Sequence, residues 1–383
     1  MFDVSDLLSG YDLSRIRIGA FGGLGALDIT SGARLSGFPS VIVASRGRDK
    51  TYMKHFRARQ RGPASIGCVD DVITVDEFED VLNANVQQQL RSMNTIFLQS
   101  RYFWVYTRDY GRVEREFNVP MFGSRTLLRI EDRDQPYNQH DLLSEAGIRT
   151  PRRFALPDQI DRLVIVKVHE ALRGHERAFF LAWDKESYES YAQHLLDRRQ
   201  ITKEGLEKAV IEEYIIGVPV TFHFFCSPLR GEVELLGMGM RRQTNLDGFL
   251  RMTAKQQEIA LRHVPLKMIE VGQVPCTLKE SLLEKTFDIA EEFVSITQSL
   301  PREIDPSGKG IIGPFALQGV VVAEEGREDI VIFDVSFRSA GMPGAVASPY
   351  STYLYGRPMS VGERIGIELR DAIAGGCLEE VVT

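Results

Sequence analysis

The chain has 383 residues, 43% of them hydrophobic and 26% charged, which is enough for two or three packed domains of an ordinary globular protein. Its formal net charge of -7 argues against nucleic-acid binding, because a nucleic-acid-binding surface needs positive charge to displace counterions. The cysteines are far apart with no CxxC pair, and no apolar stretch reaches the roughly 18 residues of a membrane span, so we expect a cytoplasmic protein without a disulfide framework or a zinc site.

The first third of the chain alternates between strand-like and helix-like segments. A β-rich run at residues 16–21 leads into a glycine-rich turn at residues 22–25 and then into a helical segment. Further strands are expected at residues 41–44, 71–75 and 95–98, with a helix at residues 78–93. Because such alternation is typical of a mostly parallel sheet, we expect residues 1–125 to form an N-terminal α/β domain.

The rest of the chain is richer in strands. We expect residues 126–383 to form a second domain, in which residues from about 150 to 215 form a small lid. Its predicted strands are residues 163–168, 178–182, 210–216, 220–226, 233–239, 315–322 and 330–335. Its predicted helices are one that ends at Gly147, and residues 185–198, 203–209 and 278–298.

Two segments carry residue types that suit ATP. Lys167 ends an apolar strand, where its ammonium group could leave the sheet and meet phosphate. The segment Glu212, Glu213, Tyr214 and Ile215 follows another apolar run and could offer backbone groups to adenine and a carboxylate to ribose. The alternative for both is a solvated strand end with surface charges, because lysine and glutamate are mostly exposed in proteins.

A third segment alternates between apolar and polar residues. On a strand, Asp334, Ser336 and Arg338 project from one face. A carboxylate, a hydroxyl oxygen and a guanidinium group there suit Mg²⁺ and the phosphates that it carries, and Gln318 could add an amide oxygen from a neighbouring strand. An edge strand with a polar outer face is the alternative, because any half-buried strand alternates in this way.

The order of these segments resembles the ATP-grasp superfamily, and more narrowly the archaeal 5-formaminoimidazole-4-carboxamide ribonucleotide (FAICAR) synthetase family. The resemblance runs from about residue 18 to residue 373. It rests on ordered blocks that are each weak alone: PMFGSRTLLR at residues 120–129, LLSEAGI at 142–148, IEEYIIG at 211–217, CSPL at 226–229, ELLG at 234–237, TNLDG at 244–248, GPF at 313–315 and PMSVG at 358–362.

The resemblance implies an α/β ATP-grasp fold with an N-terminal parallel-sheet domain, the pre-ATP-grasp domain. In that family a carboxylate attacks the γ-phosphate of ATP, and an amine captures the resulting acyl phosphate. The implied partners are a small carboxylate and a small amine, one of them a nucleotide or heterocycle, and a second copy of the chain in a homo-oligomer.

The resemblance also assigns roles to residues. Asn245 would face the nucleotide substrate. Lys167 and Arg338 would serve catalysis, and Mg²⁺, or Mn²⁺ in its place, would bind the oxygen atoms of Gln318, Asp334 and Ser336. ATP would contact Lys167, Glu212, Glu213, Tyr214 and Ile215.

The chain departs from the family pattern at the substrate end. Family members read Gly-Ser-His-Ser after the first strand, whereas this chain has Gly23, Leu24 and Gly25 there. A second substrate-contacting block, usually Pro-His-Gly-Ser-Phe, is replaced by a block that contains Arg101 and Tyr102. The glycine amides and Arg101 could bind an anion instead; alternatively, these residues form only a tight turn and a surface contact.

Three functional hypotheses follow from the retained ATP end and the changed substrate end. The first is a carboxylate-amine ligase whose acid or amine differs from that of the family. The second is an authentic FAICAR synthetase that uses formate and the aminoimidazole carboxamide ribonucleotide. The third is a nucleotide-binding relative without turnover, suggested by Gln318 in place of an acidic ligand and by a glycine-poor flap at residues 169–177.

Overall fold

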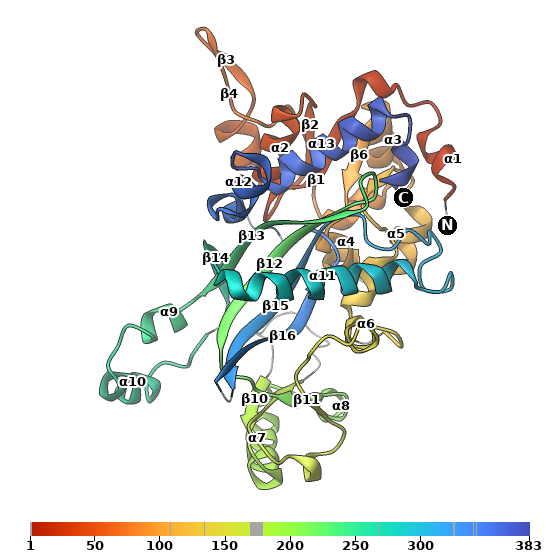
Figure 1. Ribbon diagram of the computed structural model, residues 1–383. Coiled ribbons are helices and arrows are strands. Elements are labelled where there is room, and N and C mark those ends of the chain that lie inside the picture. Colours follow the sequence, from red (N-terminus) through yellow and green to blue (C-terminus); the bar gives the residue numbers. More distant parts are fainter. Residues whose placement is uncertain are drawn as a thin grey trace.

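Three β-sheets organise the chain in this computed structural model, which describes residues 2–107, 109–133, 135–168, 179–267, 269–324, 326–339, 341 and 343–383. Figure 1 shows the large antiparallel sheet through the centre, with the N-terminal sheet and its helices above it and a small sheet below. The glycine-poor flap predicted at residues 169–177 lies outside the described residues.

The N-terminal sheet is parallel throughout, in the order β5-β2-β1-β6-β7. Its strands are β1 (Arg17–Phe21), β2 (Ser40–Ser45), β5 (Asp71–Val75), β6 (Thr95–Leu98) and β7 (Met121–Phe122). The central strands are buried almost continuously, as expected when helices cover both faces of a parallel sheet. The prediction of a mostly parallel sheet is therefore confirmed.

Helices and one hairpin surround this sheet. They are α1 (Val4–Leu8), η1 (Leu13–Arg15), α2 (Ala26–Leu35), the π-helical turn η2 (Thr51–His55), the hairpin β3 (Arg59–Arg61) and β4 (Ala64–Ile66), η3 (Phe78–Leu82), α3 (Ala84–Ser92), α4 (Arg101–Thr107) and α5 (Tyr110–Glu116). The helix predicted at residues 78–93 is thus divided, because Asn83 is extended and begins a new helix.

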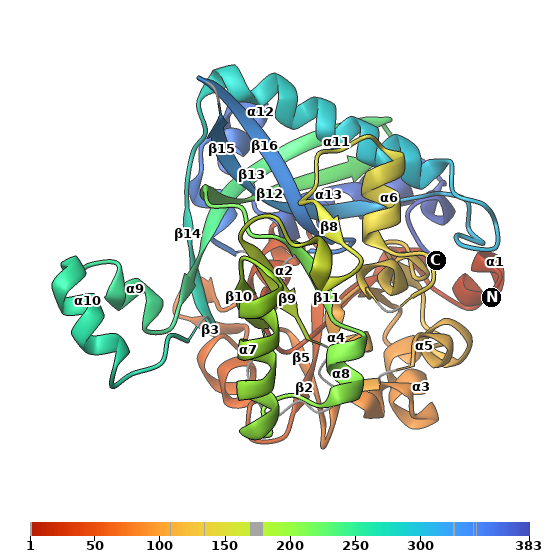
Figure 2. The same cartoon turned by 90° about the horizontal axis from the view of Figure 1, so that it is seen from below.

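The small sheet is antiparallel, in the order β10-β9-β11-β8. It consists of β8 (Arg153–Phe154), β9 (Val164–Lys167), β10 (Phe179–Ala182) and β11 (Val210–Glu213), together with η5 (Pro157–Gln159), α7 (Lys185–Asp197) and α8 (Lys203–Glu207). Apolar residues of β9, β10, β11 and α7 form a separate hydrophobic cluster, so this unit packs largely on itself. Figure 2 shows it nearest the viewer, in front of α2 and the N-terminal sheet.

The large sheet is also antiparallel, in the order β14-β13-β12-β15-β16. Its strands are β12 (Val218–Ser227), β13 (Glu232–Gln243), β14 (Glu270–Pro275), β15 (Gly313–Glu324) and β16 (Arg327–Ser336). The remaining helices of this part are η4 (Leu127–Glu131), α6 (Gln139–Glu145), α9 (Leu246–Phe249), α10 (Ala254–Leu261), η6 (Glu280–Leu282), α11 (Leu283–Gln298), η7 (Pro343–Ala347) and α12 (Tyr350–Tyr355). The core of this part contains stacked aromatic rings, including those of Phe293 and Phe315, whose centroids are 5.6 Å apart.

The C-terminal helix α13 (Val361–Ala374), followed by η8 (Leu378–Glu380), returns to the N-terminal sheet and packs against α2. The helices approach so closely that a Cβ atom on Gly32 would lie 2.0 Å from the backbone nitrogen of Glu363. One hydrophobic cluster includes residues of β1, α2 and α13 together with Phe225 of the large sheet, so it joins the N-terminal and central parts of the molecule. None of the described helices has the length and apolar character that a bilayer crossing requires.

Candidate active site

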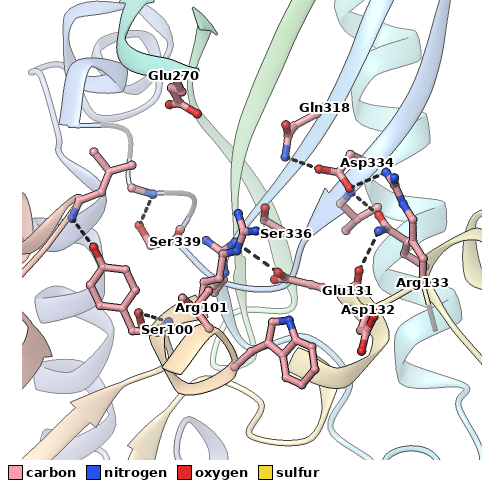
Figure 3. A pocket seen from close by; sticks show the side chains of 18 of the residues that line it. Ser100, Arg101, Glu131, Asp132, Arg133, Glu270, Gln318, Asp334, Ser336 and Ser339 are labelled. Carbon is pink, nitrogen blue, oxygen red and sulfur yellow. Dashed lines mark hydrogen bonds and ion pairs between the residues drawn. The ribbon is translucent and has the colours of Figure 1, made fainter. Parts of the chain in front are cut away.

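The three sheets border a cavity of about 880 Å³ (Figure 3). Residues of β9 and β11 line one side, residues of β12 to β16 line another, and the carboxyl ends of β1 and β6 line a third. Among the predicted site residues, the structure brings these into the cavity lining: Leu24, Arg101, Tyr102, Lys167, Gln318, Asp334, Ser336 and Arg338. Residues predicted from distant parts of the sequence therefore meet in one place.

Lys167 extends from the end of β9 into this cavity. Its ammonium group forms an ion pair with Glu212 of the adjacent strand β11, whose side chain is buried. Burial and the nearby Arg133 lower the pKa of Lys167, while Glu212 acts in the opposite direction. Lys167 thus combines a cationic head with a partner that fixes its direction, as a phosphate-binding lysine requires.

The other residues of the predicted ATP segment lie outside the cavity lining. Glu213 faces the opposite side of β11, where it accepts a hydrogen bond from Arg162 at 3.1 Å. The backbone N–H of Tyr214 donates to the carbonyl of Leu163 at 2.9 Å, and Ile215 packs against a small apolar cluster on β15 and β16. Of this segment, only Glu212 reaches the site, and it does so through Lys167.

Asp334 and Gln318 lie side by side on β16 and β15, where they are register partners. The side-chain amide nitrogen of Gln318 donates to Asp334 at 3.1 Å, and its oxygen accepts from Arg241. The guanidinium group of Arg133 is 3.3 Å from the other carboxylate oxygen of Asp334. Two arginines therefore already contact the oxygen atoms that the sequence assigned to a metal.

This donor set fits Mg²⁺, which accepts oxygen ligands, keeps several waters and takes the rest of its shell from substrate phosphates. One carboxylate, one amide oxygen and the hydroxyl of Ser336 lie along the cavity wall. Within the described residues, no group of three or more His, Cys, Asp or Glu side chains could hold a metal ion. A cation bound at Asp334 would consequently depend on the phosphates of the nucleotide.

Arg338 follows β16 and is held by Glu131. Its guanidinium group donates to Glu131 at 3.2 Å and to the carbonyl of Ser339 at 3.1 Å, whereas its Nε atom is buried and bonded to no residue that the structure describes. Glu131 also accepts the backbone N–H of Phe337 at 2.8 Å. Burial raises the pKa of Glu131, although Arg338 and Arg101 favour its charged form.

The cavity has a positive electrostatic environment beside Lys167. His140 is a buried residue of α6, and its pKa is lowered to about 3 by burial and by the nearby Arg153, Arg133 and Lys167. Burial is the largest cause of this shift, and the three nearby cations add a positive field to it. Such a field favours a polyanion such as a nucleotide triphosphate.

The N-terminal wall is built where β1 meets α2. Gly23 packs directly on Tyr102, because a Cβ atom at this position would lie 2.0 Å from the tyrosine hydroxyl oxygen. The same hydroxyl group accepts the backbone N–H of Leu24 at 3.4 Å, and Gly25 has a φ angle of 87°, which favours glycine. Gly23 and Gly25 therefore shape the turn, while the side chain of Leu24, 62% exposed, faces the cavity.

Asn245 lies away from this cavity lining. It precedes α9, has a φ angle of 43° and exchanges hydrogen bonds with its local loop, donating to the carbonyl of Pro265 at 2.8 Å and accepting from the backbone N–H of Lys267 at 2.7 Å. The structure does not bring Asn245 together with the other predicted substrate residues.

Sequence reasoning missed several charged residues of the site: Glu131, Asp132, Arg133, Arg241 and Glu270. The first three follow one another at the end of η4, immediately after the PMFGSRTLLR block, so a charged run beside a family-like block was the available signal. Arg241 and Glu270 pair across β13 and β14 at 3.4 Å, and β14 itself was not predicted.

Family models, sequence relatives and solved structures are all similar to this chain over most of its length. A family model described as a domain of unknown function, DUF1297, matches residues 187–383, and one described as a protein of unknown function, DUF1246, matches residues 18–154. The 5-formaminoimidazole-4-carboxamide-1-(beta)-D-ribofuranosyl 5'-monophosphate synthetase of Methanobrevibacter smithii is 35% identical over 385 residues, which cover 100% of this chain and 98% of the relative.

Solved structures share the architecture. An IMP biosynthesis protein PurP from Thermococcus kodakaraensis has a TM-score of 0.68 and 26% identity over 96% of this chain and 100% of its own. An ADP complex of N5-carboxyaminoimidazole ribonucleotide synthetase has a TM-score of 0.54 at 11% identity, over 90% of this chain and 78% of its own, which indicates a common fold alone.

Proposed function

The chain belongs to the family of 5-formaminoimidazole-4-carboxamide ribonucleotide synthetases, which are ATP-grasp ligases, and we propose that it joins a small carboxylate to a small amine through an acyl phosphate, releasing ADP and phosphate. The observation that carries this proposal is the meeting of Lys167, Asp334 and Arg338 in one cavity. A cation, an oxygen ligand for a metal and a guanidinium group are the parts that phosphoryl transfer needs.

In this proposal the residues act mainly by positioning and by charge. Lys167 binds the phosphates of ATP, with Glu212 holding its direction. Mg²⁺, with Mn²⁺ as an alternative, would be held by Asp334 with the oxygens of Gln318 and Ser336 and would neutralise the phosphate oxygens. Arg338 stabilises the charge that develops as the carboxylate attacks the γ-phosphate.

The remaining assignments follow from the family. The segment from Glu213 to Ile215 is proposed to contact the nucleotide after the small sheet moves toward the large one, because these residues connect β11 with β12. The substrates are proposed to be small molecules. Asn245 is proposed to contact the nucleotide-like substrate only if its loop changes position.

Measuring ADP release with a panel of carboxylates and amines tests this proposal. We expect one acid and amine pair to stimulate turnover, and Asp334→Asn to reduce that turnover by at least about 100-fold, because the variant removes the only carboxylate proposed to hold the metal. Glu328→Gln, on the exposed part of the same strand, is the matched control and should keep full activity. ATP binding without turnover for any pair would support the non-catalytic alternative instead.

A second candidate, authentic FAICAR synthetase, is favoured by the 35% identity over the full chain to curated synthetases. Supplying ATP, formate and the aminoimidazole carboxamide ribonucleotide distinguishes the two candidates. Formation of the formylated ribonucleotide would establish the second candidate, and its absence, with turnover on another pair, would leave the first.

A further inference from the structure

The wall of the cavity that the N-terminal sheet supplies is apolar and aromatic. Phe21, Leu24 and Tyr102 line it beside Trp104, whose ring stacks on Tyr110 with centroids 4.2 Å apart and an interplanar angle of 5°. Aromatic rings and a largely exposed leucine at a cavity wall offer a flat surface to an apolar group of a ligand. This wall therefore differs from the charged wall around Lys167 and Asp334, which we propose faces ATP.

Two opposite charges border the aromatic wall. The side chain of the exposed Arg101 lines the cavity and forms no hydrogen bond or ion pair with any residue in the described ranges. Glu131, which is paired with Arg338, also interacts electrostatically with Arg101, and Figure 3 shows both Arg101 and Glu131 among the residues that line the cavity. Each oxygen of Glu131 accepts one hydrogen bond, and a carboxylate can accept about four in total. The carboxylate can thus receive an additional donor.

Two backbone N–H groups of the glycine turn are already used within the protein and are not offered to a phosphate group. A helix N-terminus binds an anion through its first N–H groups when they are free. Here the N–H of Leu24, before the helix, donates to the Tyr102 hydroxyl group, and that of Ala26, the first residue of α2, donates to the carbonyl of Gly23 at 3.1 Å.

We propose that the amine substrate is an α-amino acid with an aromatic or large apolar side chain. Its carboxylate pairs with Arg101, its ammonium group with Glu131, and its side chain lies on the aromatic wall at Tyr102 and Trp104. A zwitterionic head needs a cation and an anion in the same site, and Arg101 and Glu131 both line the cavity beside the apolar surface. The inference rests on the proposed function, since it names the amine that the acyl phosphate meets.

The chemical step balances with the groups present. The ammonium group transfers one proton to Glu131, and the amine nitrogen then forms a C–N bond with the carbonyl carbon of the acyl phosphate. The bond between that carbon and the phosphate oxygen breaks, and phosphate leaves with the electron pair. The second proton passes from the substrate nitrogen to the leaving phosphate.

Calorimetric binding to the full chain, with Mg²⁺ and a non-hydrolysable ATP analogue present, tests the assignment. We expect L-phenylalanine to bind, and 3-phenylpropionate, 2-phenylethylamine and L-alanine to bind at least about 10-fold more weakly, because each lacks one of the three recognised groups. Arg101→Gln should lower the affinity for L-phenylalanine to that for 2-phenylethylamine, while the affinity for 2-phenylethylamine itself should not change. Arg115→Gln, an exposed arginine of α5 outside the cavity lining, is the control and should change neither.

Three outcomes would overturn the inference. The first is that L-phenylalanine does not bind at concentrations up to about 10 mM, the weakest affinity of interest. The second is that Arg101→Gln weakens the binding of L-phenylalanine and of 2-phenylethylamine equally, and the third is that the aminoimidazole carboxamide ribonucleotide binds more tightly than any amino acid. Failure of the proposed function has a different signature, because then the ATP analogue itself does not bind. If the analogue binds and ADP release requires the ribonucleotide, the ligase activity stands and the amino-acid assignment alone is rejected.

Discussion

At the scale of single residues, the ion pair between Lys167 and Glu212 joins two strands and directs a cation into the cavity. We expect Lys167→Met to weaken binding of an ATP analogue by about 10- to 100-fold, since a charge-assisted hydrogen bond contributes about 1.5–3 kcal/mol. Calorimetry with Mg²⁺ present measures the change. Lys203→Met, on α8 and outside the cavity lining, should bind the analogue normally.

The same variant leaves Glu212 buried without its partner, which could itself destabilise the fold. The double variant Lys167→Met with Glu212→Gln separates the two effects. We expect it to recover the urea midpoint of the wild type but not its affinity for the ATP analogue. Recovery of affinity in the double variant would show that Lys167 serves the fold rather than the nucleotide.

Alternation along one strand explains which site residues the sequence could predict. Asp334 and Ser336 enter the cavity together because every second residue of a strand faces the same side. Glu131 could not be found in this way, because its contact with Arg338 depends on how η4 crosses the end of β16, 207 positions apart in the chain. The sequence carries residue types and local periodicity, whereas such a crossing is set by the packing of the whole fold.

At the scale of elements, the turn between β1 and α2 packs closely against Tyr102 of α4. Gly23→Ala would place a methyl group against the hydroxyl oxygen of Tyr102, so we expect a loss of about 1–3 kcal/mol in the free energy of unfolding. Combined with Tyr102→Ala, the substitution should cost at least about 1 kcal/mol less than the sum of the single changes, because the clash is then gone. Urea unfolding measures all three variants.

A suitable control for this prediction is Gly248→Ala in α9, because no atom lies within 4 Å of the added Cβ and the backbone has no positive φ. This variant should be as stable as the wild type or slightly more so, since alanine favours the helix. Strict additivity of Gly23→Ala and Tyr102→Ala would contradict the proposed contact.

Asp28 links α2 with α13, since its carboxylate accepts the backbone N–H of Gly362 at 2.9 Å. Burial raises the pKa of Asp28 from 3.8 to about 6. The folded chain therefore binds more protons than the unfolded chain between these values, and this group's contribution to stability falls as the pH rises from about 4 to about 6. The charged form at neutral pH is consequently unfavourable in the folded state.

We expect Asp28→Asn to be more stable than the wild type at pH 7.5, by on the order of 1 kcal/mol, because the amide oxygen can still accept from Gly362 without a buried charge. At pH 4 the difference should be much smaller. Urea midpoints of both proteins across this range give the measurement. A difference that does not depend on pH would mean that Asp28 does not titrate as described.

Strands and helices were predicted correctly where apolar runs were continuous. They were missed where tertiary packing, rather than local sequence, determines the secondary structure. The strands at residues 41–44 and 95–98 were recognised because both faces are buried and the runs are largely apolar, and the edge strand at residues 71–75 because it is rich in β-branched residues. Helix α4, with the sequence RYFWVYT, was missed, because aromatic and β-branched residues are weak helix formers. Its aromatic rings pack on Phe21 and Phe78, and these tertiary contacts hold the helix.

At the scale of the whole molecule, an arm that contains α9 and α10 extends from the ends of β13 and β14 away from the rest of the chain (Figures 1 and 2). Leu250, Ile259 and Val271 are 72%, 53% and 63% exposed, and no residue of α10 is buried. Soluble monomers rarely leave apolar residues together on a surface in this way. The outer edge of β14 also lacks a neighbouring strand within the described residues, so its backbone groups can pair with another strand.

We therefore expect the arm to pack against a second copy of the chain, in keeping with the homo-oligomer that the family resemblance implies. Light scattering after size exclusion should give a multiple of 43.2 kDa for the wild type. Leu250→Glu combined with Val271→Lys should shift the protein toward the monomer, because burying two uncompensated charges costs several kcal/mol. Leu35→Glu, an equally exposed leucine on α2, should keep the wild-type mass. A monomeric wild type at about 50 μM would contradict this prediction, since obligate interfaces are saturated far below that concentration.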